Sequence, residues 1–236
     1  MKNEVVILAG GRGQRLRPYT NLVPKPMLKV GSKPILEYLI TNVKKHGFNK
    51  VILAVGYKGE IIEDYFKDGS DFGISIEYSY EDKPKNTAGA LLQLQDKLND
   101  HFLVLMGDHI TDINLRALFD FHLQSNKMVT MTVREIENAI EYGVVKADNN
   151  IVFRIDEKPI EKMLFNVAIY AMNKRVFNYI EEGEDIVKHL LPKLLDKKEV
   201  QTYVMKNYWK DIGRVKDYEY MNEYMSLIEL YFNLFK

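Results

Sequence analysis

The chain has 236 residues, 46% of them apolar, which is enough to bury a sizeable core in a single α/β domain. Its 33 basic residues balance 33 acidic ones, so no overall field favours a nucleic acid or an anionic membrane as partner. Cysteine is absent, which excludes disulfides and thiolate metal sites. With no membrane-length apolar run and no signal-peptide pattern at the N-terminus, we expect a cytoplasmic protein.

The first half of the chain alternates short β-branched runs with amphipathic stretches. We predict strands at 5–9, 51–55, 74–80, 102–106 and 128–133, and helices at 35–46, 60–66, 87–98 and 115–125. Continuously apolar strands separated by helices are typical of a sheet that is covered on both faces. The fold class is therefore α/β, with a doubly wound, mostly parallel, Rossmann-like sheet.

After residue 134 the rhythm changes to β-like segments that follow one another with little helix between them. We place these segments at 143–147, 151–157 and 165–172, followed by helices at 174–181 and 185–195 and a strand at 200–204. No Pro/Gly/Ser-rich linker separates the halves, so we expect one domain over 1–236, with a substrate lobe on the same sheet.

The chain ends in a predicted long helix, 215–235, with two lines of apolar residues. One line contains Tyr218, Met221, Met225, Ile228, Phe232 and Phe235, and the other contains Tyr220, Tyr224, Leu227, Tyr231 and Leu234. One such stripe is the usual signature of a helix packed on its own domain. Two stripes are wider than one packing face needs, so we expect a homo-oligomer.

The strongest motif follows the first predicted strand, from Leu8 to Pro18, with Pro24-Lys25-Pro26 downstream. Three glycines after a strand let backbone N–H groups approach phosphate oxygens, and nearby arginines and a lysine supply positive charge. Neither the dinucleotide-binding pattern nor the P-loop pattern is present. The expected guest is a triphosphate.

This motif resembles that of the sugar-1-phosphate nucleotidyltransferases, L-A-G-G-x-G-x-R-L-x-P-x-T followed by P-K-P. The resemblance continues through most of the chain and is nearest to the mannose-1-phosphate guanylyltransferase-like branch. It implies a nucleotide-binding half at 1–133, a sugar-phosphate-binding half at 134–214 and a C-terminal helix at 215–236. It also implies that Arg15 and Lys25 are catalytic, while the triphosphate is held by Leu8, Ala9, Gly10, Gly11 and Gly13.

A second block, 81–89, is similar to the family pattern E/Q-x-x-P-x-G-T-A that frames the nucleobase. It implies nucleotide contacts from Glu81, Pro84, Asn86 and Thr87. Asn86 stands where the family has glycine; asparagine tolerates a left-handed backbone, although its side chain could reach the base. On the local sequence alone, Asn86 or Thr87 could equally be the N-cap of the helix that follows.

Two acidic residues are candidates for metal binding. Asp108 ends a predicted central strand, where ligands bind in open α/β sheets and where Mg²⁺ on phosphates takes one or two carboxylates. The resemblance of 209–213 to the family motif W-x-D-I-G implies that Asp211 completes the Mg²⁺ site. His109 departs from the family pattern, and we expect a supporting or structural role for it.

The sugar-phosphate side rests mainly on the resemblance to family segments Y-G-V, E-K-P and N-x-G-I-Y. These imply that Gly143, Glu157, Lys158 and Asn166 bind the sugar phosphate, with Ala168 replacing the usual glycine. Glutamate can accept sugar hydroxyls and lysine can bind a phosphate.

The implied reaction joins a nucleoside triphosphate to a sugar 1-phosphate and releases pyrophosphate, with GTP and mannose 1-phosphate or a related sugar phosphate as first choice. Glucose-1-phosphate thymidylyl-, uridylyl- or cytidylyl-transfer is the alternative. An inert nucleotide-sugar-binding regulatory subunit is an alternative of another class, against which the presence of Arg15, Lys25, Asp108 and Asp211 argues.

Overall fold

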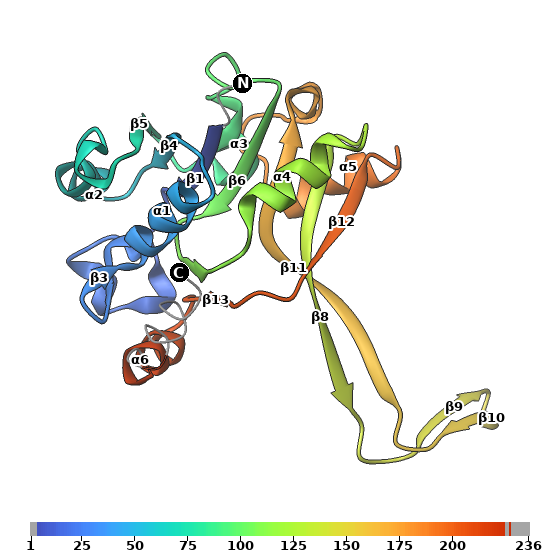
Figure 1. Cartoon of the computed structure of the whole chain (residues 1–236). Helices are drawn as coiled ribbons and strands as arrows, with labels where there is room; N and C mark the ends of the chain where they lie inside the picture. The colour runs from blue at the N-terminus through green and yellow to red at the C-terminus, as the bar shows by residue number, and fades with distance from the viewer. Residues whose placement is uncertain (1–3, 225–226, 228–236) are drawn as a thin grey trace.

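The computed structural model describes residues 4–224 and 227 and is built around a seven-stranded sheet (Figure 1). The strand order is β12 (Val200–Met205), β8 (Val129–Ala139), β11 (Ile160–Asn173), β6 (His101–Met106), β1 (Glu4–Ala9), β4 (Lys50–Val55) and β5 (Ser75–Tyr80). Only β11 runs antiparallel to its neighbours, β6 and β8, while every other pairing is parallel. The predicted mostly parallel α/β sheet is confirmed.

Helices cover both faces of the sheet because successive side chains of each central strand point to opposite sides. Val5 and Ile7 pack beneath α1 (Ile35–Lys45), α2 (Gly59–Phe66) and α4 (Leu115–Leu123), whereas Val6 packs against α3 (Asn86–Leu92) and the segments after β11. Those segments are the 3₁₀ helix η5 (Lys174–Tyr179), the π-helical turn η6 (Ile186–Leu190) and α5 (Leu191–Leu195). The sheet is therefore doubly wound.

A third, smaller core lies beside the sheet and brings distant parts of the chain together. It joins β2 (Lys29–Val30), the start of α1, β7 (His109–Thr111), Ile212 directly after β13 (Trp209–Asp211), and α6 (Val215–Glu223). The short strand β3 (Lys33–Pro34) pairs with β2. Three short 3₁₀ turns connect β1 to this core, η1 (Gln14–Leu16), η2 (Tyr19–Asn21) and η3 (Lys25–Met27), and a fourth, η4 (Ser70–Phe72), precedes β5. The antiparallel pairing of β13 with β7 holds Asp211 opposite His109.

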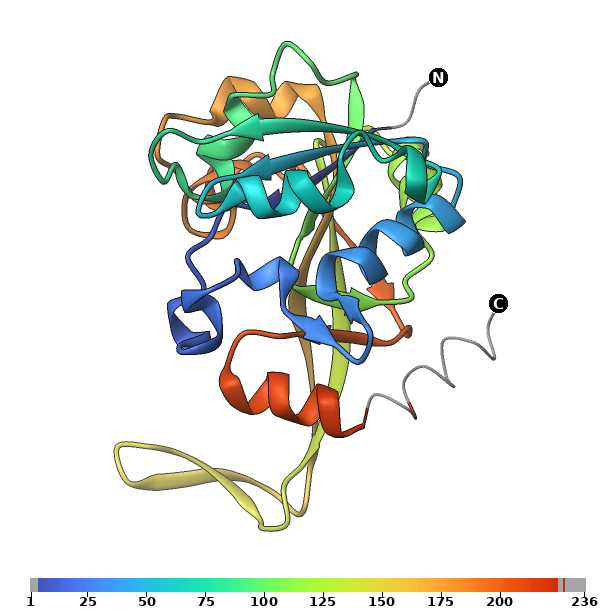
Figure 2. The same cartoon turned by 90° about the vertical axis from the view of Figure 1, so that its left-hand side faces the viewer.

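A two-stranded ribbon extends from the body of the protein (Figures 1 and 2). We use "the ribbon" for β8 beyond Arg134, the hairpin β9 (Val144–Asp148) and β10 (Ile151–Asp156), and β11 up to Asn166. Ten large apolar side chains on it are exposed: Ile136, Tyr142, Val145, Ile151, Val152, Phe153, Ile155, Ile160, Met163 and Leu164.

Several predicted helices differ in detail from the structure. The helix predicted at 87–98 ends at Leu92 and continues as tight turns, in which the N–H of Leu94 bonds the carbonyl of Leu91. The segment 174–181 is a 3₁₀ helix, and 185–195 divides at Pro192, which has no N–H to continue the helical ladder. Of the predicted terminal helix, α6 is described to Glu223, and nearly all of the remainder lies outside the described residues. No helix in the described part combines the length and apolar character needed to cross a membrane.

Candidate active site

A cavity of about 520 Å³ opens at the carboxyl ends of β1 and β6, a size that suits a nucleotide. Its lining comes from four sequence regions: the loop after β1, η3, the 81–90 block and the end of β6, with Asp185 and Gly213 added from the second half. The lining residues are Leu8, Ala9, Gly10, Gly11, Arg12, Gly13, Gln14, Arg15, Lys25, Pro26, Glu81, Pro84, Asn86, Thr87, Ala90, Met106, Asp108, Asp185 and Gly213.

The glycines of the first loop have separate structural reasons. Gly13 has a left-handed backbone, with φ +60°, and a Cβ there would lie 2.9 Å from the Thr20 side chain. Gly10 lies against the Glu81 carboxylate, which a Cβ would approach to 3.3 Å. The loop thus depends on glycine both to turn and to allow this close approach.

Two cationic side chains flank the loop. Arg15 lies on η1 and is exposed, so its guanidinium can move toward a bound anion. Lys25 begins η3, immediately after Pro24 in an extended conformation, and its side chain is only 12% exposed. The Lys25 Nζ bonds Asp108 Oδ2 and lies 3.6 Å from Asp211 Oδ1. Lys25 is therefore held between the two predicted metal carboxylates.

Asp108, His109 and Asp211 form one cluster, in which one ligand-type atom from each residue lies within 4.8 Å of the others. Burial opposes ionisation of Asp108, but the neighbouring His109 and Lys25 outweigh it and lower the pKa of that carboxyl. Burial also lowers the pKa of His109, although both aspartates attract its proton. The cluster presents an ionised carboxylate at the end of β6.

The carboxylate oxygens of this cluster are suitable ligands for a divalent cation. Asp211 Oδ1 is buried and has no hydrogen-bond partner among the residues that the structure describes, and the Lys25 ammonium already shows that the two carboxylates compensate a positive charge. Oxygen donors of this kind are the ligands that Mg²⁺ and Mn²⁺ take beside a phosphate. Asp108 and Asp211 are the residues that would hold the ion.

The 81–90 block forms the opposite wall of the cavity. Burial raises the pKa of Glu81, against the N–H and the charge of Lys85. Asn86 has φ 56°, so the residue that replaces the family's glycine does adopt the left-handed backbone. Its Nδ2 donates to the carbonyl of Gly183 at 2.8 Å, which ties the side chain to the neighbouring loop.

The loop before η6 holds the start of α3 in place. Thr87 Oγ1 donates to Asp185 Oδ2 at 2.9 Å and accepts from the N–H of Ile186, while the N–H groups of Ala88 and Gly89 both bond the carbonyl of Glu184. Asp185 also caps η6 through the N–H groups of Val187 and Lys188. A turn that lines the cavity is thus fastened to a segment about a hundred residues away in sequence.

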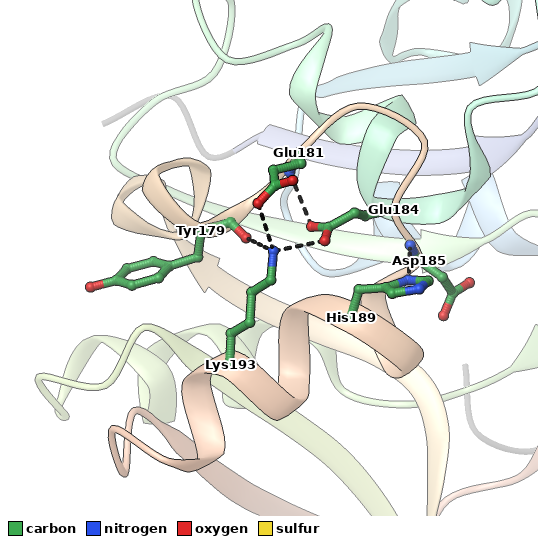
Figure 3. Close-up of polar contacts among 6 residues, drawn as sticks. All are labelled: Tyr179, Glu181, Glu184, Asp185, His189 and Lys193. Carbon is green, nitrogen blue, oxygen red and sulfur yellow. Dashed lines mark hydrogen bonds and ion pairs between the residues drawn. The ribbon is translucent and has the colours of Figure 1, made fainter.

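A polar cluster anchors this loop from the side of α5 (Figure 3). Lys193 Nζ lies 2.7 Å from Glu184 Oε1 and 3.5 Å from Glu181 Oε1, and it also bonds the carbonyl of Tyr179. His189 Nδ1 accepts from the N–H of Asp185 at 2.9 Å. The loop from Glu181 to Asp185 is therefore held at both of its ends, by Lys193 and by His189.

The four predicted sugar-phosphate residues are not brought to the cavity. Gly143, Glu157 and Lys158 flank the β9–β10 hairpin at the far end of the ribbon, and none of the three is in the cavity lining (Figure 1). Gly143 and Glu157 adjoin each other, since a Cβ on the glycine would lie 3.0 Å from the Glu157 Oε2. Asn166 is also outside the lining, and its Nδ2 donates to the Tyr170 hydroxyl.

The structure adds residues that sequence reasoning did not select. Asp185 is part of the cavity lining, as are Arg12, Gln14, Ala90 and Met106. An acidic N-cap before an apolar run was the only available signal for Asp185, and such a signal is equally typical of an ordinary helix start.

Comparison with known proteins assigns the chain to a family. A family model described as "Nucleotidyl transferase" matches residues 4–226. The chain belongs to this family. This nucleotidyl transferase is 34% identical to a UTP–glucose-1-phosphate uridylyltransferase of Synechocystis over 91% of the chain and 61% of that protein. It is 33% identical to a mannose-1-phosphate guanyltransferase of Saccharomyces cerevisiae over 90% of the chain and 62% of that protein.

Among solved structures, HddC from Yersinia pseudotuberculosis matches this nucleotidyl transferase with a TM-score of 0.74 at 25% identity, over 94% of the chain and 99% of that protein. The chain spans about three fifths of the length of the curated relatives it matches. Family membership and the fold are therefore established.

Proposed function

We propose that this nucleotidyl transferase forms a nucleotide sugar and pyrophosphate from a nucleoside triphosphate and a sugar 1-phosphate. The supporting observation is the content of one cavity, in which the glycine loop, Arg15, Lys25, Glu81 and Asp108 meet. The Asp211 carboxylate reaches the same place through its ion pair with Lys25. A regulatory subunit without activity has no need for this set of charges.

The chemistry is an in-line displacement at the α-phosphorus. An oxygen of the sugar phosphate forms the new P–O bond while the bond to the β-phosphate oxygen breaks, and pyrophosphate leaves with that electron pair. Attacking and leaving groups are both anions, so the chain needs no general base, only alignment and charge compensation. Lys25 and Arg15 supply positive charge. A divalent ion, Mg²⁺ in this proposal, held by Asp108 and Asp211 supplies the remaining charge neutralisation when bound.

The nucleobase is proposed to be guanine, on the strength of Glu81. A carboxylate offers acceptors only, and guanine presents two adjacent donors, N1–H and N2–H₂, that a carboxylate can receive together. Uracil and thymine present one N–H between two carbonyl oxygens, which the Glu81 carboxylate repels. GTP is the first expected triphosphate, with mannose 1-phosphate or a related sugar 1-phosphate as its partner. Uridylyl transfer is the main rival, because a uridylyltransferase is among the relatives.

Pyrophosphate release, measured with each triphosphate in turn against a panel of sugar 1-phosphates, tests the proposal. We expect turnover with GTP, and we expect it to stop with excess EDTA. The substitution Glu81→Gln is expected to shift the preference for the triphosphate from GTP toward UTP, since an amide can pair with the N–H and one carbonyl of uracil. Asp82→Asn, a change at the exposed neighbouring residue, is the matched control. No pyrophosphate with any pair would reject the reaction, and equal GTP preference in Glu81→Gln would reject the base assignment.

The sugar-phosphate roles of Gly143, Glu157, Lys158 and Asn166 remain part of this proposal. For the first three to contact a sugar phosphate, the ribbon has to bend toward the body or enter the cavity of a second copy. Glu157→Gln is then expected to raise the Michaelis constant for the sugar 1-phosphate and leave that for the triphosphate unchanged. If the wild type and Glu157→Gln have the same Michaelis constants for both substrates, Glu157 is not part of the site. We also propose that the protein forms oligomers and that it functions in the cytoplasm.

A further inference from the structure

His109 lies in the metal cluster without an evident structural bond. It is 3% exposed, yet its Nδ1 has no hydrogen-bond partner among the described residues. Its Nε2 lies 3.7 Å from Asp108 Oδ1, which is beyond hydrogen-bond distance. Buried polar atoms in proteins are normally satisfied, so a buried imidazole aimed at a carboxylate without bonding it needs an explanation.

The ring is held by packing. The imidazole meets the Trp209 ring edge-on, with centroids 5.3 Å apart, and β7 and β13 pair His109 directly with Asp211. The imidazole is therefore presented to the two carboxylates from a paired strand, and only small side-chain movements are open to it.

The two basic residues of the cluster approach different oxygens of Asp108. Lys25 bonds Oδ2, whereas the His109 Nε2 faces Oδ1. A cation on the Oδ1 side can therefore meet the imidazole without removing Lys25 from Oδ2. Two ligands on opposite sides of a small divalent ion are about 4.2 Å apart, so the observed span of up to 4.8 Å has to contract by roughly half an ångström.

We propose that His109 is a third protein ligand of the divalent ion and makes the site favour Mn²⁺ and later first-row ions over Mg²⁺. This inference rests on the proposed metal site of Asp108 and Asp211. Imidazole nitrogen suits transition metals, whereas Mg²⁺ prefers oxygen donors. Replacing one oxygen donor of an all-oxygen site by nitrogen therefore changes which ion the site selects.

Mn²⁺ bound to the full-length chain is the probe, because its electron spin reports directly bonded nitrogen. Pulsed electron paramagnetic resonance is expected to show ¹⁴N modulation in the wild type and no such modulation in His109→Gln. Protein labelled with ¹⁵N-histidine is expected to lose the ¹⁴N pattern with no change of sequence, so the assignment does not depend on a variant that folds. His46→Gln, at the C-terminal cap of α1, is the control that keeps the signal.

Equilibrium binding supplies the second measurement. We expect the ratio of Mn²⁺ affinity to Mg²⁺ affinity to fall about tenfold or more in His109→Gln, with Mg²⁺ affinity changed less than about threefold. Absence of nitrogen coupling, absence of Mn²⁺ binding, or an unchanged affinity ratio overturns the inference. If the protein releases pyrophosphate but shows no nitrogen coupling, only the assignment of His109 as a ligand is rejected. If it shows nitrogen coupling but releases no pyrophosphate under any condition, the proposed reaction is rejected and the ligand assignment stands.

Discussion

Lys25 is the residue on which the cavity's electrostatics depend most directly. It lies after Pro24, whose ring fixes φ, and before Pro26, which restricts the lysine backbone in turn. The ammonium is already paired with Asp108 and is mostly shielded from water. Such a cation loses little conformational freedom when charge develops on a nearby phosphate.

We predict that Lys25→Ala lowers kcat by about a hundred- to a thousand-fold, the usual loss for one donor that acts on a transition state. In Lys25→Ala the Michaelis constant for the triphosphate should change far less than kcat. Arg15→Ala, on the exposed η1 turn, should raise that Michaelis constant more than Lys25→Ala does. Steady-state kinetics with Lys29→Ala as an exposed control provide the measurement. An unchanged kcat with weaker binding in Lys25→Ala would make Lys25 a simple phosphate ligand.

At this scale the sequence predicted which residues of the first half lie together in one cavity. Every predicted nucleotide residue, from Leu8 to Thr87, lines the cavity, because consecutive residues in a glycine loop or before a helix remain neighbours in space. Asp185 escaped prediction because its place beside Thr87 depends on a tertiary contact. No local pattern records such a contact.

Within β11, Ala168 carries a conformational cost that the sequence only suggested. Its φ of 54° is left-handed, and it lies where the β8–β11 register shifts between Asn166 and Tyr170. A residue with a Cβ loses roughly 1–2 kcal/mol in this conformation. The Asn166 side chain, which accepts from the Ala168 N–H at 2.8 Å, helps to hold the bulge.

We predict that Ala168→Gly raises the free energy of unfolding by about 0.5–1 kcal/mol, since glycine relieves the strain but has more freedom in the unfolded chain. Ala171→Gly is the matched control in the same strand, where φ is not left-handed, and it should destabilise the protein. Urea unfolding of both variants decides the matter. Destabilisation of similar size in both would show that the bulge stores no strain.

Elements with strong periodicity were predicted almost to their ends, as β1, β4 and α1 show. The short pair β7 and β13 was not predicted, because three-residue strands carry no measurable period. The change from the π-helical turn η6 to α5 also escaped prediction, since Pro192 is compatible with the first turn of a helix as well as with a break.

At the scale of the whole molecule, a buried polar network ties α4 to the sheet. His122 Nδ1 lies 2.8 Å from Thr130 Oγ1, and its Nε2 lies 3.1 Å from Nδ1 of His101. Gln201 from β12 donates to Thr130, and Asn173 from β11 contacts His101. Burial, with some repulsion from His101, lowers the pKa of His122 to about 4.

This network predicts a loss of stability in weak acid. Between about pH 6.5 and pH 4 the unfolded chain takes up a proton at His122 and the folded chain does not, so the free energy of unfolding falls as pH falls. The contribution is at most about 1.4 kcal/mol per pH unit for one group. Urea unfolding from pH 7.5 to 4.5 should show a shallower slope for His122→Gln than for the wild type, with surface His189→Gln as the control. Equal slopes would contradict the assignment.

Association of the protein is the remaining whole-molecule prediction. In the described part of α6, Met221 is buried against the third core, whereas Tyr220 is half exposed, and Tyr224 and Leu227, which follow α6, are also exposed. Among the described residues, the first line therefore packs on the domain through Met221, and the second line faces outward at Tyr220, Tyr224 and Leu227. We expect an oligomer by light scattering at micromolar concentration, and a single-chain mass for the double variant Tyr220→Lys, Leu227→Lys. A single-chain mass for the wild type would reject the prediction.

The pairing of β7 with β13 has a consequence for the order in which this protein becomes competent. The glycine loop after β1 and the 81–90 block come from the first hundred residues, whereas Asp108 and Asp211 are separated by about a hundred residues. Closing so long a loop costs chain entropy that only late, long-range contacts repay. During folding or synthesis, the chain can therefore bring the glycine loop and the 81–90 block together before it can bring Asp211 to Asp108.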